Sequence, residues 1–190
     1  MKKYLVMLFV IVISQIGKSQ TCPDYGSASN QRLKILNVLK NREIVESKID
    51  KSVTIDSILK FGNDTGRFSD NKYICVVGYC VLAKWGGPES CNCKTDDKSQ
   101  WDIHLVISSD SNISNQDSCI IVEITRKYRN LHDPIKPSDF VNHKLSISGY
   151  MFRDDEHLGE SINTTTTGTK HCFRKTSWEI HPVVKIEILE

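Results

Sequence analysis

The apolar positions divide the chain into a helical first part and a strand-rich second part. Between residues 29 and 42, apolar side chains recur at helical spacing among lysine, arginine and asparagine, which predicts an amphipathic helix. Its expected inner stripe comprises Leu33, Ile35, Leu36, Val38 and Leu39. Residues 54–60 predict a second, short helix that ends before Gly62. Together these segments indicate a helical N-terminal region over residues 20–66.

Five later segments are rich in β-branched residues or alternate between apolar and polar positions, which is typical of strands. They cover residues 73–84, 102–108, 119–125, 144–152 and 177–189. The positions expected to face inward are Ile103, Leu105, Ile107, Ile120, Val122, Ile124, Trp178, Ile180, Val184, Ile186 and Ile188. Gly78 and Gly149 interrupt the first and fourth strands, and a glycine inside a strand favours a bulge or bend.

The order of these elements predicts the fold class. Residues 137–141 can form a helical turn, so three strands are followed by a short helix and two more strands. A mainly β, five-stranded Greek-key barrel of the OB-fold type has this order. We therefore expect an OB-like β-barrel domain over residues 67–190, with the N-terminal helical segment packed outside it. An open antiparallel sandwich is the alternative.

The first 19 residues have the pattern of a signal peptide. Lys2 and Lys3 precede an apolar run over residues 4–13, and small residues, Gly17 and Ser19, stand before a cleavage point at Gln20. The run is too short to span a bilayer as a helix. We expect export to the periplasm or the extracellular space, with no transmembrane segment left after cleavage. A lipid anchor on Cys22 is not favoured, because Thr21 and Ser19 fit a lipidation site poorly.

Charge excludes one class of partner. The predicted signal segment carries three lysines and no acid, so its removal changes the formal net charge from +2 to −1. Strong non-specific binding to nucleic acid requires many Lys and Arg contacts to phosphates. We therefore expect an unidentified ligand or an envelope partner instead.

Seven cysteines in an exported chain predict disulfides, with one thiol left over because the number is odd. Cys91 and Cys93 are too close in sequence to pair comfortably with each other, so each is expected to have a distant partner. A zinc site built from cysteines is the alternative, but the spacing matches no common zinc pattern.

Three of the six histidines follow an acid by two residues, although fewer than one such pair is expected by chance from 23 acids in 190 residues. In a strand, residues two apart point to the same side. In an OB-like barrel the three pairs would lie near one end, where His104, His157 and His181 could bind zinc or another divalent metal. Asp102 or Glu179 would then act as a base or orient a ligand. The alternative is that these residues form solvated polar faces.

Four further residues are candidates for ligand binding. Trp101 and Tyr128 could stack on bases or sugars, and Arg126 lies within a basic run, residues 126–129. Glu123 could join the acid and histidine cluster from the third strand. Core packing of the aromatic rings and a solvated basic loop are the alternatives.

Several local motifs carry a family resemblance. They are the segments 36–42 (LNVLKNR), 86–93 (GGPESCNC), 102–104 (DIH), 121–125 (IVEIT) and 178–183 (WEIHPV). Together they resemble a family of exported bacterial proteins of unassigned function, and the C-terminal WEIHPV motif is the most specific part. Arg126 stands where such relatives usually have a proline. The resemblance implies a secreted domain and supplies no catalytic residues.

Three functions are compatible with these features. The first, which we favour, is an exported OB-fold-like binding protein. The second is a metal-dependent hydrolase, a nuclease or phosphoesterase, that uses the acid and histidine cluster. The third is a structural envelope protein stabilised by disulfides.

Overall fold

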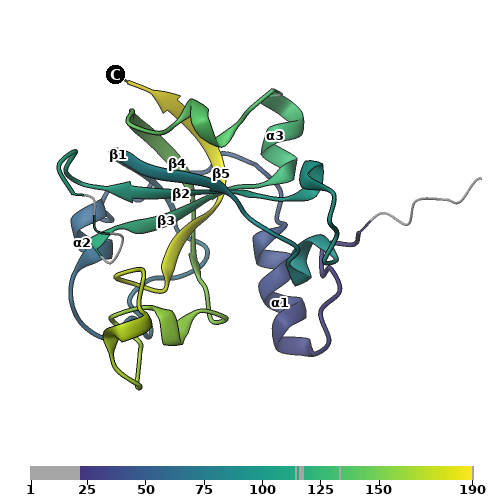
Figure 1. Cartoon of the computed structure of the whole chain (residues 1–190), viewed down its shortest axis with the longest axis horizontal. Helices are drawn as coiled ribbons and strands as arrows, with labels where there is room; N and C mark the ends of the chain where they lie inside the picture. The colour runs from purple at the N-terminus through teal and green to yellow at the C-terminus, as the bar shows by residue number, and fades with distance from the viewer. Residues whose placement is uncertain (1–21, 114, 116–117, 133, 190) are drawn as a thin grey trace, which may run out of the picture.

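Five strands close into a barrel at the centre of the computed structural model, which describes residues 22–189 except 114, 116–117 and 133 (Figure 1). The strands are β1 (Tyr73–Trp85), β2 (Ile103–Ser108), β3 (Ile120–Ile124), β4 (Lys144–Arg153) and β5 (Trp178–Ile188). Each begins and ends within one residue of a predicted strand, so the strand predictions are confirmed. The predicted signal peptide, residues 1–19, lies outside the described residues.

The strand order around the barrel is β1-β2-β3-β5-β4, and β4 pairs with β1 to close it. β3 and β5 run parallel, and the other neighbouring strands run antiparallel. The closed barrel shows that the open sandwich, the alternative fold, is wrong. The order also places β3 between β2 and β5, which decides the neighbours of every outward-facing side chain on β3.

Helices lie around the barrel, and one of the three α-helices in the described residues was not predicted. The α-helices are α1 (Gln31–Lys40), α2 (Ile55–Leu59) and α3 (Arg126–His132). Short 3-10 helices cover Ser90–Asn92, Lys98–Gln100, Pro137–Asp139, Leu158–Glu160 and Thr169–His171. The expected turn after residue 137 is one of these 3-10 helices, whereas the basic run after β3 forms α3 and not a loop. Thr125 explains the difference, because its Oγ1 accepts a hydrogen bond from the Tyr128 amide and caps the helix start.

The core fills the barrel with the alternate side chains that the pattern predicted. Ile103, Leu105, Ile107, Ile120, Val122 and Ile124 are all fully buried there. β5 departs from the prediction, since Val183 and not Val184 belongs to the core and Ile188 is half exposed. The β4–β5 register shifts on both sides of Gly149, so the alternation on β5 changes phase.

At Gly149 and Gly78, neighbouring atoms lie so close to the Cα atom that a Cβ would clash with them. A Cβ on Gly149 would lie 2.5 Å from the Pro182 carbonyl oxygen. A Cβ on Gly78 would lie 2.6 Å from Ile107 Cγ2, so a packed side chain requires this glycine. The irregularity in β1 falls later, between Cys80 and Leu82. The register shift therefore coincides with the glycine in β4, whereas in β1 it lies beyond the glycine.

α1 packs beside the barrel through a face that its apolar pattern did not predict (Figure 1). Its buried residues are Leu36, Asn37 and Lys40, while Ile35 and Val38 are about half exposed. The predicted stripe is therefore wrong in part. Lys40 pairs with Glu89 and Glu156, and Asn37 makes hydrogen bonds with Tyr25 and Ser90, so polar partners decide which face of the helix is buried.

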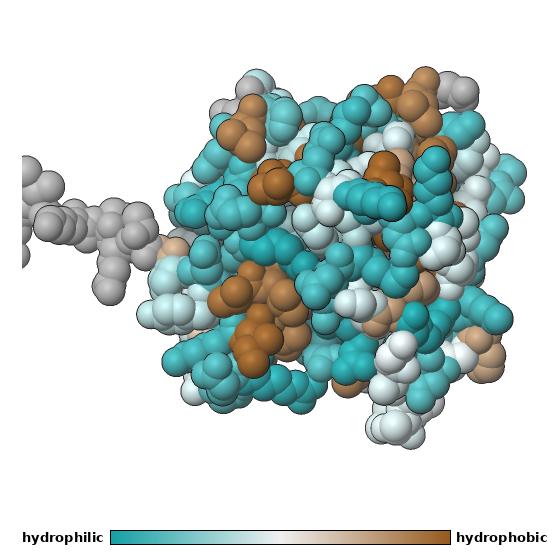
Figure 2. Space-filling view, turned by 180° about the vertical axis from the view of Figure 1, so that it is seen from behind, coloured by the Kyte–Doolittle hydropathy of each residue, from teal (hydrophilic) through white to brown (hydrophobic). Residues whose placement is uncertain are grey.

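The outer surface is mostly polar on the face seen from behind, where hydrophobic residues form separate groups (Figure 2). Within the described ranges, no helix has the length and apolar character needed to cross a bilayer.

Candidate functional site

Three adjacent strands bring acids and histidines together on the outside of the barrel. His104 on β2 lies directly opposite Glu123 on β3. β3 pairs in parallel with β5, with Val122 opposite Ile180, and this register brings the next outward residues, Glu123 and His181, together. Glu123 is therefore flanked by an imidazole on each side.

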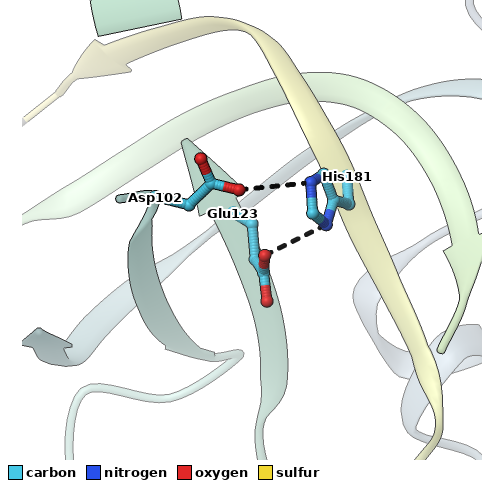
Figure 3. Close-up of side chains that lie close together, drawn as sticks. All are labelled: Asp102, Glu123 and His181. Carbon is cyan, nitrogen blue, oxygen red and sulfur yellow. Dashed lines mark ion pairs between the residues drawn. The ribbon is translucent and has the colours of Figure 1, made fainter. Parts of the chain in front are cut away.

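His181 lies between two carboxylates (Figure 3). Its Nδ1 is 3.1 Å from Glu123 Oε2, and its Nε2 is 3.6 Å from Asp102 Oδ2. A third carboxylate oxygen, Glu179 Oε2, is 3.9 Å from Nδ1. The side chain of His181 is fully buried, so its charge is exposed to these carboxylates with little screening by water.

His104 makes a parallel set of contacts one strand away. Its Nε2 is 3.4 Å from Glu123 Oε1 and 3.5 Å from Glu89 Oε1. Gly86 leaves room for the ring, because a Cβ there would lie 2.8 Å from His104 Nε2. The 86–93 turn therefore contacts His104 twice: the Glu89 carboxylate lies beside the ring, and the backbone at Gly86 packs against it.

Two permanent cations complete the cluster. Lys40 of α1 is 2% exposed, and its Nζ lies 3.3 Å from Glu89 and 3.6 Å from Glu156. Arg174 forms an ion pair with Glu179 and lies 3.7 Å from Asp154 Oδ2. Asp154 also pairs with His157 Nδ1. We call these residues the charged cluster; its members are Lys40, Glu89, Asp102, His104, Glu123, Asp154, Glu156, His157, Arg174, Glu179 and His181.

The carboxylates decide the protonation of the two central histidines. Burial by itself lowers the pKa of an imidazole. Glu123, Glu179 and Asp102 outweigh this effect for His181 and raise its pKa to about 10. For His104, burial is outweighed in the same way, and the pKa is raised to about 9. Both rings are therefore cationic at neutral pH.

The pKa values of the two carboxyl groups nearest to His181, those of Asp102 and Glu123, shift in opposite directions. Burial raises the pKa of Asp102 to about 6, although His181 opposes the change. Burial also acts to raise the pKa of Glu123, but His104, His181 and Lys40 hold it well below its usual range. Glu123 is therefore the permanent anion at the centre of the cluster, and Asp102 titrates at a higher pH than an ordinary aspartate.

A pocket of about 430 Å³ opens over one side of the charged cluster. Its lining comprises Lys40, Lys84, Glu89, Ser90, His104, Val106, Ile121, Glu123, Glu156, His157, Phe173 and Arg174. The walls thus combine charges of both signs with a few apolar side chains. This volume is within the range of small-molecule sites in proteins.

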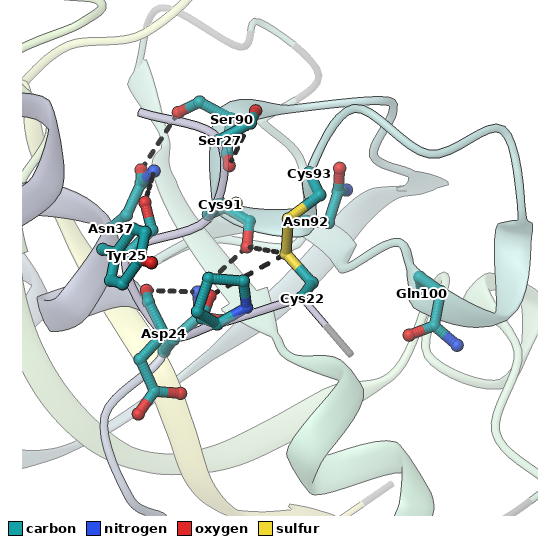
Figure 4. The surroundings of a disulfide bond; sticks show 12 residues. Cys22, Asp24, Tyr25, Ser27, Asn37, Ser90, Cys91, Asn92, Cys93 and Gln100 are labelled. Atoms are coloured by element: carbon teal, nitrogen blue, oxygen red, sulfur yellow. Dashed lines mark hydrogen bonds between the residues drawn. A yellow bond between two sulfur atoms is a disulfide. The ribbon is translucent and has the colours of Figure 1, made fainter. Parts of the chain in front are cut away.

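A disulfide joins the N-terminal segment to the 86–93 turn, which supplies Glu89 to the cluster (Figure 4). Cys22 is bonded to Cys93, so the expected distant partner exists for Cys93. The same expectation is wrong for Cys91, which is a buried thiol. Asn37 of α1 reinforces the join, since it donates to the Tyr25 carbonyl oxygen at 2.9 Å and accepts from Ser90 Oγ at 3.0 Å.

The structure gathers the predicted acid and histidine residues around Glu123, with His157 farther out. His104 and His181 lie on opposite sides of Glu123, and His157 borders the same pocket as His104. Within the described part of the chain, one set of three potential metal ligands has donor atoms within 4.8 Å of one another: Asp102, Glu123 and His181. This set differs from the three-histidine set expected from sequence, because β3 separates β2 from β5.

The side chains of the other predicted ligand-binding residues, Trp101, Arg126 and Tyr128, are not members of the charged cluster. Tyr128 is buried in the barrel core, so core packing, the alternative from sequence, explains its ring. The Trp101 indole donates to the Thr95 carbonyl oxygen at 2.7 Å. The Arg126 amide donates to Asp102 Oδ1 at 3.2 Å. Arg126 therefore contacts the cluster through its backbone, next to a small hollow that it lines together with Asp102.

The patterns in the sequence did not identify five members of the cluster: Lys40, Glu89, Asp154, Glu156 and Arg174. One signal was available for Lys40, which follows Leu36 by four residues and therefore shares its helix face. The others come from loops far apart in the sequence, and no local pattern marks them.

Comparison with known proteins gives no family. No protein-family model matches the chain, and no curated protein matches it either.

Proposed function

We propose that this protein is an exported, OB-fold-like binding protein whose pocket beside the charged cluster takes a small polar ligand. The observation that carries the proposal is the pocket of about 430 Å³ with buried charged groups in its lining. Lys40 and Arg174 are at most 8% exposed, as is Glu123. Charges held at fixed positions with little water around them give a ligand strong and directional contacts.

The strand order supports the OB-like assignment. A closed barrel in the order β1-β2-β3-β5-β4, with α3 between β3 and β4, has the element sequence of that fold. The Greek-key detail and the role of α3 belong to this proposal.

The signal-like N-terminus and the disulfide support export. Disulfides persist mainly in oxidising compartments, and the Cys22–Cys93 bond uses the sulfur atom that a lipid anchor would need. Membership of the exported family with the WEIHPV motif is part of the same proposal.

The lining favours a ligand that carries both charges. Lys84 and the cluster cations can contact an anionic group, and Glu89 and Glu156 can contact a cationic one. Phe173, Val106 and Ile121 offer a short apolar wall for the remainder of the ligand. A free amino acid or a very short peptide has this chemistry and fits the volume.

The experiment uses free amino acids as probes. We expect saturation-transfer NMR and calorimetry to detect binding of one or more of them. The N-acetyl and amide derivatives of the same amino acids lack one charge each, and we expect them to bind at least about tenfold more weakly, a difference of about 1.4 kcal/mol.

Two rim variants and one control locate the site. Lys84→Ala and Phe173→Ala should each weaken binding about tenfold, because both side chains line the pocket and neither belongs to the charged cluster, although the Phe173 ring lies 5.2 Å from the Arg174 guanidinium. Lys51→Ala, an exposed lysine outside the pocket lining, should leave binding unchanged. The proposal is wrong if no amino acid binds, or if the uncharged derivatives bind equally well.

A further inference from the structure

We infer that Asp102, Glu123 and His181 bind one divalent transition-metal ion beneath the pocket. One donor atom from each residue lies within 4.8 Å of the others. Ligands at about 2.0–2.2 Å from a first-row metal lie up to about 4.4 Å apart, so small side-chain movements suffice to bring all three to one ion.

The state of His181 is the second observation. Its side chain is fully buried, and within the described chain neither ring nitrogen makes a hydrogen bond of normal geometry. Glu123 Oε2, which lies 3.1 Å from His181 Nδ1, is also buried without a hydrogen bond of normal geometry. Polar atoms in such a position are costly unless another group satisfies them. A metal ion would satisfy an imidazole nitrogen and a carboxylate oxygen together.

The surrounding charges favour a cation. Three carboxylate groups, from Asp102, Glu123 and Glu179, lie 3.1–3.9 Å from the ring nitrogens of His181, and one of them, Glu179, is paired with Arg174. A divalent ion at this position would compensate these carboxylates directly, and its binding would require a deprotonated imidazole nitrogen.

The position is open to the outside from two directions. Glu123 borders the large pocket, and Asp102 borders a small hollow of about 30 Å³ beside the Cys22–Cys93 disulfide. Phe152 packs edge-on against the His181 ring, with ring centroids 5.5 Å apart, and restricts its rotation. The histidine is thus held in place while the two carboxylates face routes by which an ion can enter.

The ligand set indicates the class of metal. One imidazole nitrogen with carboxylate oxygens suits Zn²⁺, Mn²⁺ or Fe²⁺, whereas Ca²⁺ and Mg²⁺ prefer oxygen ligands alone. Three protein ligands leave a coordination position for water or for a ligand in the pocket. Such a site is also what the metal-dependent hydrolase hypothesis requires.

Calorimetry with Zn²⁺ and Mn²⁺ on the chelator-treated, disulfide-bonded protein tests the inference. We expect one ion per chain, and Asp102→Asn should weaken binding by at least ~100-fold. Asp102 is the most exposed of the three ligands, so this variant is the one best able to fold. The matched control is Asp155→Asn, whose side chain is equally shielded, at 16% exposure against 13%, and pairs with Arg32 and Arg153 instead.

A spectroscopic measurement on the unmodified protein removes any dependence on variant folding. Pulsed EPR of the bound Mn²⁺ should show coupling to a directly bound imidazole nitrogen. A protein that binds neither ion, equal affinity in Asp102→Asn, or Mn²⁺ without nitrogen coupling would each overturn the inference and leave His181 as a buried ion-pair partner. Lys84→Ala should not change the affinity for metal, so failure of the pocket proposal and failure of the metal site are distinguishable.

Discussion

On β2, β3 and β5 the inner face and the part of the outer face around Glu123 are both buried, and their chemistry is opposite. Leu105, Val122 and Ile180 point into the barrel and are completely buried. Glu123 and His181 point outward from the same strands and are 3% and 0% exposed. The inner face is stabilised by filling volume, whereas the outer face depends on each charge retaining its partner. Burial alone therefore does not tell a core from a candidate site.

The largest effect should come from removing one charge on the outer face. Lys40→Met should destabilise the protein by about 4 kcal/mol, because Glu89 and Glu156 would lose their buried counter-charge. Urea unfolding at neutral pH measures the change. Lys34→Met is the matched control, since Lys34 is exposed on the same helix and its loss should cost no more than about 0.5 kcal/mol. Equal effects for the two lysines would contradict the role of the charged cluster.

A deletion on the inner face should cost slightly less. Leu105→Ala should destabilise the protein by about 3 kcal/mol through the cavity it leaves. The urea midpoint should fall while the binding of Zn²⁺ and of amino acids stays unchanged wherever the protein is folded. A loss of metal affinity without a loss of stability would show that the two faces are not independent.

Removing the disulfide tests how the outer face is covered. Cys22→Ser combined with Cys93→Ser should lower stability by about 2 kcal/mol, since the bond closes a loop between cysteines 71 positions apart. The barrel should remain folded by circular dichroism, and hydrogen exchange should increase mainly in residues 22–42. Cys172→Ser, which removes a half-buried thiol, is the control. Complete unfolding of the double variant would mean that the barrel cannot form without its cover.

The smallest effect should appear at the edge of the cluster. The hydrogen bond to Asp154 raises the pKa of His157 in the folded protein. A raised pKa means that the stabilisation is complete below the unfolded value, about 6.5, and is lost as the pH rises through the folded value. His157→Gln should therefore cost roughly 0.5 kcal/mol at pH 5.5, because the ring is partly exposed, and less at pH 9. If the loss of stability in His157→Gln grew with pH, the pKa of His157 would be lowered in the folded protein, not raised.

The candidate site was predictable in part. Two-residue spacing identified Asp102, His104, Glu179 and His181 as neighbours on a strand face, since that spacing is a local property of extended backbone. Glu123 was included on its strand, but its central place was not predictable. It follows from the order β2-β3-β5, which only the closed barrel supplies. Lys40 and Glu89, 49 residues apart, meet only after α1 packs on the barrel.

Alternation and helical spacing act between near neighbours, so the residue pattern predicts the five strands, their inward faces through most of the barrel and the N-terminal helices. The burial of the outward charges, in contrast, follows from the packing of distant segments. That result requires the segment before residue 42 and the 86–93 turn to cover the outside of β2, β3 and β5. The cover brings together charges that stand far apart along the chain, and their mutual compensation depends on distances that no local pattern records.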